Sequence, residues 1–236
     1  MPPSPLPTDK LPVVVIACQV FQHLLEEHLP PGLAHSVTYL DYGLHRIPRN
    51  LGQKIQELLD SIQEPSLVVL GYGLCGNGMN GVRAGRHILL IPRADDCIAI
   101  LLGSYQAYQR EFQSAPGTYY LSKGWLESGS NPLSEYQKYV EKYGSEKADW
   151  IMDQQYQNYK RLAFVAHNLQ DLEQYRPQAE DVAKFCQRWG MSYEEILGSE
   201  DFIKRLIQVA AALDSASEDF LIIPPGGEIN QNQFIR

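Results

Sequence analysis

Short, continuously apolar runs recur along this chain, and they limit its possible folds more than any other feature. The runs are VVVIAC (13–18), SLVVL (66–70), HILLI (87–91), LAFVAH (162–167) and FLIIP (220–224). Such runs are typical of strands buried on both faces of a parallel sheet. Amphipathic stretches lie between them, such as Asn50 to Gln63, whose leucines and isoleucines fall on one helical stripe. We therefore predict an α/β fold of two Rossmann-like units, with mostly parallel sheet and flanking helices.

Changes in composition divide the chain into four predicted parts. Residues 1–11 are rich in proline and are expected to form a disordered leader. Residues 12–125 form a first α/β unit, and residues 160–236 form a second one. Residues 126–159 between them are polar and rich in Tyr and Gln, which predicts a helical insertion that serves as a lid or a subunit interface.

Charge and hydropathy exclude two broad classes of function. The formal net charge is -8, whereas nucleic-acid binding needs clustered Lys and Arg, so we expect no nucleic-acid partner. The most apolar stretch, Cys97 to Gly103, is far shorter than the ~20 residues of a spanning helix, so we expect no membrane association. The N-terminus lacks the apolar segment of a secretory signal, and a cytoplasmic location is the expectation.

The four cysteines are too few for a disulfide framework in a chain of this length. Cys18 ends the first predicted strand, Cys75 follows the strand at 66–70, and Cys97 follows the strand at 87–91. Because parallel strands end at the same edge of a sheet, these three thiols are predicted to lie together. Cys186 falls inside a predicted amphipathic helix, 177–189, and is expected to be a core residue.

Three thiolates at one edge point to a soft metal, with an iron–sulfur cluster as the first candidate and zinc as the second. Three protein ligands also leave a position open for a substrate or an external ligand. Cys97 is expected at the N-terminus of a helix reaching about Phe112, where the helix dipole would lower the thiol pKa. Asp96 is the expected N-cap. The alternative is that the cysteines are packing residues, as isolated buried cysteines often are.

The glycine-rich segment GYGLCGNGMNG, residues 71–81, surrounds Cys75. It does not match the Walker loop, since no GK[ST] follows. We predict that its backbone amides turn toward Cys75 and stabilise a thiolate, a cluster or an anion, with Gly73, Gly76 and Asn77 contacting the ligand. A tight crossover loop is the alternative.

Three further residues are candidate ligand contacts. Arg93 is predicted to bind a carboxylate or phosphate, or else to pair with Asp95 at the surface. His167 ends a predicted strand, where it is a fourth metal ligand, a hydrogen-bonding group or a satisfied structural histidine. Tyr119 lies near a strand end and either lines a pocket or belongs to the core.

Several motifs together resemble an uncharacterised prokaryotic family that is classed as a domain of unknown function. The motifs are ACQVF, LGYGLCGNG, IPRADDCIAILLGS, PGTYYLSKGW and DFLIIPPGG. The resemblance covers nearly the whole chain from Val13, although Gln19 stands where the family usually has Gly, and Ala166-His167 where it often has Thr-Gly. It implies an association with corrinoid-dependent methyl transfer or other metallocofactor pathways.

Three hypotheses of function remain. The first is a cytoplasmic metal-binding protein that uses Cys18, Cys75 and Cys97 in methyl-group or metallocofactor metabolism, with or without catalysis. The second is a metal-free thiol enzyme with Cys75 as nucleophile and Arg93 binding an anionic substrate. The third is a non-catalytic module that delivers a metal or cofactor. The expected partner is a small molecule or cofactor, with a protein partner or a second copy of the chain as further candidates.

Overall fold

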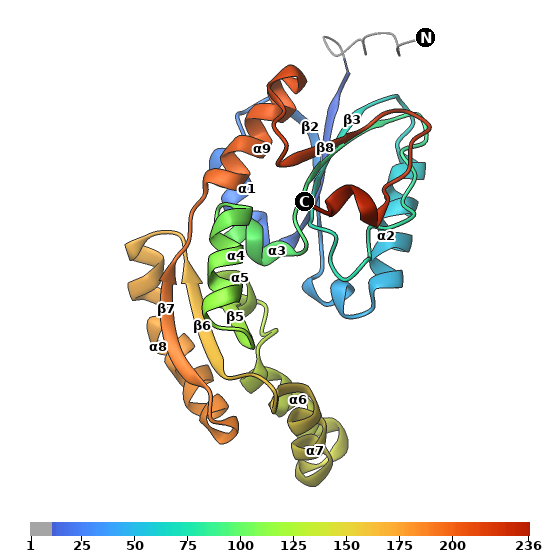
Figure 1. Cartoon of the computed structure of the whole chain (residues 1–236). Coiled ribbons are helices and arrows are strands. Elements are labelled where there is room, and N and C mark those ends of the chain that lie inside the picture. Colours follow the sequence, from blue (N-terminus) through green and yellow to red (C-terminus); the bar gives the residue numbers. More distant parts are fainter. Residues whose placement is uncertain (1–10) are drawn as a thin grey trace. The chain divides into compact units, whose positions relative to one another are not determined.

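The computed structural model describes residues 11–236, except the side chains of His45 and Arg46 (Figure 1). Most of the predicted leader, residues 1–11, lies outside the described residues. The strands are β1 (Val13–Cys18), β2 (Ala34–Leu40), β3 (Leu67–Gly71), β4 (Ile88–Pro92), β5 (Thr118–Ser122), β6 (Arg161–Ala166), β7 (Ser192–Leu197) and β8 (Phe220–Ile223). The α-helices are α1 (Gln22–His28), α2 (Pro48–Ser61), α3 (Cys97–Leu101), α4 (Tyr105–Ser114), α5 (Lys123–Glu127), α6 (Pro132–Tyr143), α7 (Ser145–Tyr156), α8 (Leu169–Cys186) and α9 (Asp201–Ala211).

The fold is α/β, with mostly parallel sheets flanked by helices, as the sequence predicts. The described part of the chain divides into two compact units: residues 11–100 with 201–236, and residues 101–200. The predicted boundaries differ from this division, because they assign residues 101–125 to the first unit and residues 201–236 to the second. The segment 201–236 returns to the first unit because it contains β8, which pairs with β4.

The first unit is built on a five-stranded sheet in the order β2-β1-β3-β4-β8. The first four strands are parallel, and β8 runs antiparallel to β4, with Leu90 opposite Ile222. Strands β1, β3 and β4 are buried along their whole length. Helices α1 and α9 pack on one face of this sheet and α2 on the other (Figure 1). Burial on both faces explains why the central strands have apolar residues at consecutive positions.

The second unit contains a parallel three-stranded sheet in the order β5-β6-β7. β6 is its central, fully buried strand, and α8 packs against β6 and β7. The helix expected from about Cys97 to Phe112 is two helices, α3 and α4. The break is at Gly103, which has a φ of +85°, and Ser104 begins the new helix by accepting a 3.0 Å hydrogen bond from the Ala107 amide.

Helices α6 and α7 occupy the predicted insertion, 126–159, and pack against each other within the second unit. Across the described part of the chain, every helix is too short or too polar to span a lipid bilayer.

Candidate cysteine site at the sheet edge

Cys18, Cys75 and Cys97 all follow neighbouring parallel strands of the first unit. Cys18 is the last residue of β1, Cys75 lies in the loop after β3, and Cys97 begins α3 after β4. The three thiols are close enough to raise one another's pKa: Cys18 acts on Cys75, and both act on Cys97. The expected gathering of these residues at one edge of one sheet is therefore observed.

The edge where they meet is a special position in this topology. Going along the chain, the strand order reverses between β1 and β3, because β2 lies on one side of β1 and β3 and β4 on the other. In open α/β sheets, ligands bind beyond the carboxyl ends of the strands at this point of reversal. The point of reversal lies between β1 and β3; Cys18 ends β1, and the loop that carries Cys75 follows β3. The cysteines thus occupy the place where this architecture normally binds a ligand.

Two glycines bring the cysteine-bearing segments together. A Cβ on Gly71 would lie 2.6 Å from the Cβ of Ala17, the residue before Cys18. A Cβ on Gly73 would lie 2.7 Å from the Ala94 carbonyl oxygen and 2.9 Å from the Asp96 Cα. Real Cβ atoms do not approach other heavy atoms this closely, so only glycine allows these backbones to touch. Gly73 therefore has a packing role, and no contact with a ligand is needed to explain it.

Hydrogen bonds join the Cys75 loop to the segment before Cys97. The Leu74 amide donates to the Ala94 carbonyl at 2.8 Å, and the Cys75 amide donates to the Asp95 carbonyl at 2.9 Å. The Gly78 amide in turn donates to the Cys75 carbonyl at 3.1 Å. These amides are used in folding the loop, so the predicted ring of amides around Cys75 is formed only in part. The Gly73 amide does hydrogen-bond to the Cys75 thiol and lowers its pKa.

Cys75 has a backbone conformation that is unfavourable for a residue with a side chain. Its φ is +50°, and Asn77 has a φ of +69°. Left-handed conformations cost non-glycine residues energy and concentrate at functional sites. Gly76 and Asn77 are exposed at the tip of this turn, with Gly76 at a φ of +62°. A glycine would occupy position 75 with less strain, so the thiol at this position calls for a reason other than loop geometry.

Burial raises the pKa of all three thiols. For Cys18 it raises the pKa to about 11, with Asp41 adding to the effect and the Val20 amide opposing it. For Cys75 and Cys97 burial is again the largest cause, and Asp96 and the neighbouring cysteines add to it. The expectation of lowered thiol pKa values is therefore wrong for the metal-free protein, because desolvation outweighs the hydrogen bonds from backbone amides.

Asp96 is the N-cap of α3, as predicted. Its carboxylate oxygen accepts a 2.8 Å hydrogen bond from the Ile98 amide. Burial nevertheless raises the pKa of Asp96, because the carboxylate is largely removed from water. The ionisable neighbours that raise the thiol pKa values, Asp41, Asp96 and the cysteines themselves, are all acids.

Sequence reasoning missed two residues at this edge, Tyr72 and Asp41. Tyr72 is 3% exposed, and its pKa is raised by burial and then by Cys18, Cys75 and Cys97. Asp41 follows β2 and acts on Cys18. One signal was available for each. Tyr72 is a bulky residue between two glycines in a strand-end loop, and Asp41 comes directly after the strand next to β1.

Arg93 has a different role from the predicted one. Its guanidinium donates to the Gln233 carbonyl at 2.7 Å and also to the Ile235 carbonyl. Its own carbonyl accepts a 2.9 Å hydrogen bond from Arg236. Arg93 thus holds the C-terminal segment at the end of β4, and its guanidinium is engaged by the carbonyl groups of that segment and not by Asp95.

Tyr119 and His167 belong to the second unit. The Tyr119 ring lies edge-on to Tyr156 and Tyr159, each at a centroid distance of 5.5 Å. Tyr119 is therefore a half-buried member of a cluster of aromatic rings. A ring nitrogen of His167 lies 3.2 Å from the Leu101 carbonyl oxygen, which agrees with a structural histidine. Cys186, also in this unit, is fully buried at the end of α8, as predicted.

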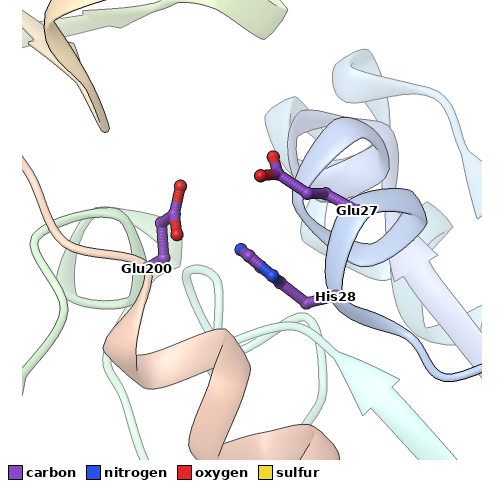
Figure 2. A group of neighbouring side chains, drawn as sticks. All are labelled: Glu27, His28 and Glu200. Atoms are coloured by element: carbon purple, nitrogen blue, oxygen red, sulfur yellow. The ribbon is translucent and has the colours of Figure 1, made fainter.

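Figure 2 shows other side chains that are able to bind metals. Glu27 and His28 are consecutive residues at the end of α1 (Figure 2). Glu200, which the same figure labels, precedes α9 and is the last residue of the second unit. None of the three was a candidate from the sequence.

The first unit thus defines a class: a doubly wound α/β protein with three cysteines at the topological switch point of its sheet. Residues 39–207 match the family model described as "Protein of unknown function (DUF1638)". The chain belongs to this family, which agrees with the uncharacterised family that the motifs resemble. No curated protein and no solved structure matches the chain.

Proposed function

We propose that this protein binds a metal cofactor through Cys18, Cys75 and Cys97, with an iron–sulfur cluster as the first candidate and zinc as the second. The observation that carries the proposal is the meeting of three thiols, those of buried Cys18 and Cys75 and of half-buried Cys97, at the switch point of the sheet. Thiolates are the preferred ligands of iron–sulfur clusters and of structural zinc. Three of them leave one coordination position for an external ligand.

The electrostatics of the site support a bound cation. Each thiol has a raised pKa in the metal-free protein, and its ionisable neighbours are acids. A metal ion reverses this situation, because it replaces the thiol protons and neutralises the repulsion among the thiolates and Asp96. The residues present therefore fit a metal.

The spacing of the sulfur atoms favours a cluster over a single ion. Tetrahedral Zn–S bonds of about 2.3 Å place two sulfur atoms about 3.8 Å apart. Among the residues that the structure describes, the three sulfur atoms do not all lie within 4.8 Å of one another. A cluster distributes its cysteines over several iron atoms, and so accommodates a wider spacing than one zinc ion does.

The same properties argue against a metal-free thiol enzyme. A nucleophilic cysteine needs a lowered pKa, so that its thiolate is present at neutral pH. Burial instead raises the pKa of Cys75. In addition, Arg93, the proposed anion-binding residue of that hypothesis, is hydrogen-bonded to the C-terminal segment.

When bound, a cluster supplies electron transfer or an open iron position for a ligand. The chain's own residues have separate tasks: Gly71 and Gly73 allow the ligand-bearing segments to approach, and the Gly73 amide donates to Cys75. A role in methyl-group or metallocofactor metabolism rests on the family resemblance. In that role the protein is either an enzyme or a module that delivers a cofactor to a protein partner. We place this role in the cytoplasm, where thiols stay reduced.

The test is to purify the protein without oxygen and to measure iron, zinc and acid-labile sulfide per chain. The wild type should contain iron and sulfide, and Cys75→Ser should lose most of both. Cys186→Ser is the matched control, since Cys186 is a buried cysteine of the other unit and should leave the metal content unchanged. A wild type without metal, or a Cys75→Ser variant with full metal content, contradicts the proposal.

A further inference from the structure

The Tyr72 hydroxyl is a buried hydrogen-bonding group without a partner. The residue is 3% exposed, and its hydroxyl oxygen has no hydrogen-bond partner within the described structure. An unsatisfied buried hydroxyl costs free energy that a phenylalanine of the same shape would not cost. Native structures satisfy nearly all such groups, so each exception needs an explanation, such as a ligand or an ion.

The position of Tyr72 indicates what the missing acceptor is. The residue lies between Gly71 and Gly73, the two glycines that bring the cysteine-bearing segments together. The groups that act on its hydroxyl are the thiols of Cys18, Cys75 and Cys97, followed by the Asp41 carboxylate. The hydroxyl is thus close to all three predicted ligands and bonds to none of them. An acceptor that sits among the three sulfur atoms would satisfy it.

We propose that Tyr72 donates its phenolic hydrogen bond to an electron-rich atom of the group that the three cysteines bind. This inference rests on the proposed function and adds a donor to it. The acceptor is an anionic atom, either a sulfide of the cluster or an anion bound at the open coordination position. Hydrogen bonds to cluster sulfurs set reduction potentials, and donors behind the metal ligands strengthen binding. Tyr72 is therefore a positioning residue for the bound group.

The protonation state of Tyr72 fits this role. Its burial and its acidic neighbours raise the pKa of the phenol, so it keeps its proton and remains a donor. The two carboxylates at this edge already accept backbone hydrogen bonds: Asp41 from the Gly43 amide at 2.7 Å, and Asp96 from the Ile98 amide at 2.8 Å.

The first test uses the metal-free protein and Tyr72→Phe. Removing an unsatisfied hydroxyl should leave the melting temperature unchanged or raise it. The matched control is Tyr156→Phe, because Tyr156 is also buried but donates a 2.8 Å hydrogen bond to Glu135. This control should lower the melting temperature. If Tyr72→Phe lowers it as much as Tyr156→Phe does, the hydroxyl has a protein partner and the inference is wrong.

The second test uses protein loaded without oxygen with iron and sulfide. If the acceptor is a cluster sulfide, Tyr72→Phe should shift the reduction potential to more negative values, since the reduced cluster loses a donor. If the acceptor is an anion on the open position, the reduction potential of the Tyr72→Phe variant should equal that of the wild type. Cyanide, used as the probe anion, should then bind the variant about 10-fold more weakly. If the wild type binds the cluster but Tyr72→Phe changes neither the reduction potential nor the affinity for cyanide, this inference alone is overturned. A wild type that binds no metal overturns the proposed function as well.

Discussion

Gly71 lies against Ala17 so closely that a Cβ on Gly71 would come within 2.6 Å of the Ala17 Cβ. This contact joins the end of β3 to the end of β1, one residue before Cys18. Gly73 makes the equivalent approach to Asp96, one residue before Cys97. The distances among the three thiols are therefore determined by backbone contacts, and they should be sensitive to a single methyl group.

We expect Gly73→Ala to reduce metal binding and to destabilise the protein by about 1–3 kcal/mol, the usual cost of overpacking. The added methyl meets backbone atoms, which cannot rotate away, so the loop must move from the segment that carries Cys97. Metal content per chain and urea unfolding measure the two effects.

Gly32→Ala is the control for that experiment. Gly32 has a φ of +81°, and an added Cβ there would have no heavy atom within 4 Å, so alanine costs about 1 kcal/mol through backbone strain alone. It should lower stability and leave the metal content intact. Equal losses of metal in the two variants would show that general destabilisation, and not the spacing of the segments, is responsible.

At position 75 we expect glycine to be better tolerated than alanine in the metal-free protein, by about 1 kcal/mol. The reason is the φ of +50° at Cys75, which penalises any Cβ. Cys186, with a φ of -73° at the end of α8, should show the opposite order, since alanine is favoured over glycine in helices by about 1 kcal/mol. Thermal unfolding of the four variants measures both differences, and the same order at both positions would contradict the assignment of strain to Cys75.

The thiols of the metal-free protein should react slowly with iodoacetamide at pH 7. The pKa of Cys18 is about 11 instead of its ordinary 9.0, so its alkylation rate should rise about tenfold per pH unit up to pH 10 without a plateau. In the same chain unfolded in urea, the rate should be half-maximal near pH 9 and should level off about one pH unit higher. A fast-reacting thiol at pH 7 in the folded protein would instead support the thiol-enzyme hypothesis.

The raised thiol pKa values also predict how stability depends on pH. Above pH 9 the unfolded chain loses thiol protons that the folded chain keeps, so the unfolded state is favoured as the pH rises. Each such thiol should reduce the free energy of unfolding by about 1.4 kcal/mol per pH unit, until its folded pKa is reached. Urea titrations of metal-free protein between pH 8 and 11 measure this slope, and Cys18→Ala should make it shallower.

Asp219 should make the protein sensitive to acid. Burial alone would raise its pKa, but hydrogen bonds from Arg236 and Arg205 outweigh burial and lower it. A carboxylate whose pKa is lowered by folding stabilises the folded state at pH values above its ordinary pKa. This stabilisation is lost as the pH falls through the pKa that the group has in the folded protein. We expect Asp219→Asn to cost about 2 kcal/mol at pH 7 and to flatten the loss of stability below pH 4. A loss that is equally large at pH 7 and pH 3 would contradict this account.

The buried strands and the shared edge of the cysteines could be predicted because their signals are local, whereas the largely exposed β7 was not predicted. A buried parallel strand is apolar at every position, and the residue after it lies at the ligand-binding edge whatever the rest of the chain does. Cys18, Cys75 and Cys97 were found in this way. The N-cap Asp96 was also predictable, since capping depends on a few adjacent residues.

The remaining features depend on contacts between distant segments. The apolar residues of β8 predict a strand, but they do not specify that this strand pairs with β4 in the first unit. Arg93 was assigned to a ligand because its partners, the carbonyls of Gln233 and Ile235, lie 140 and 142 positions away in sequence. The direction of the thiol pKa shifts also depends on burial, which no local pattern specifies.

The pairing of β8 with β4 has a consequence for how the protein is made. The ribosome completes β4 and all three of the clustered cysteines before the 101–200 unit, and β8 emerges only after that unit. At typical rates of synthesis, β4 is an unpaired edge of the nascent sheet for about 10 s. Such edges are sites of aggregation. Slow translation through residues 101–200, or a shortage of chaperones, should therefore reduce the yield of protein more than the stability of the finished fold would suggest.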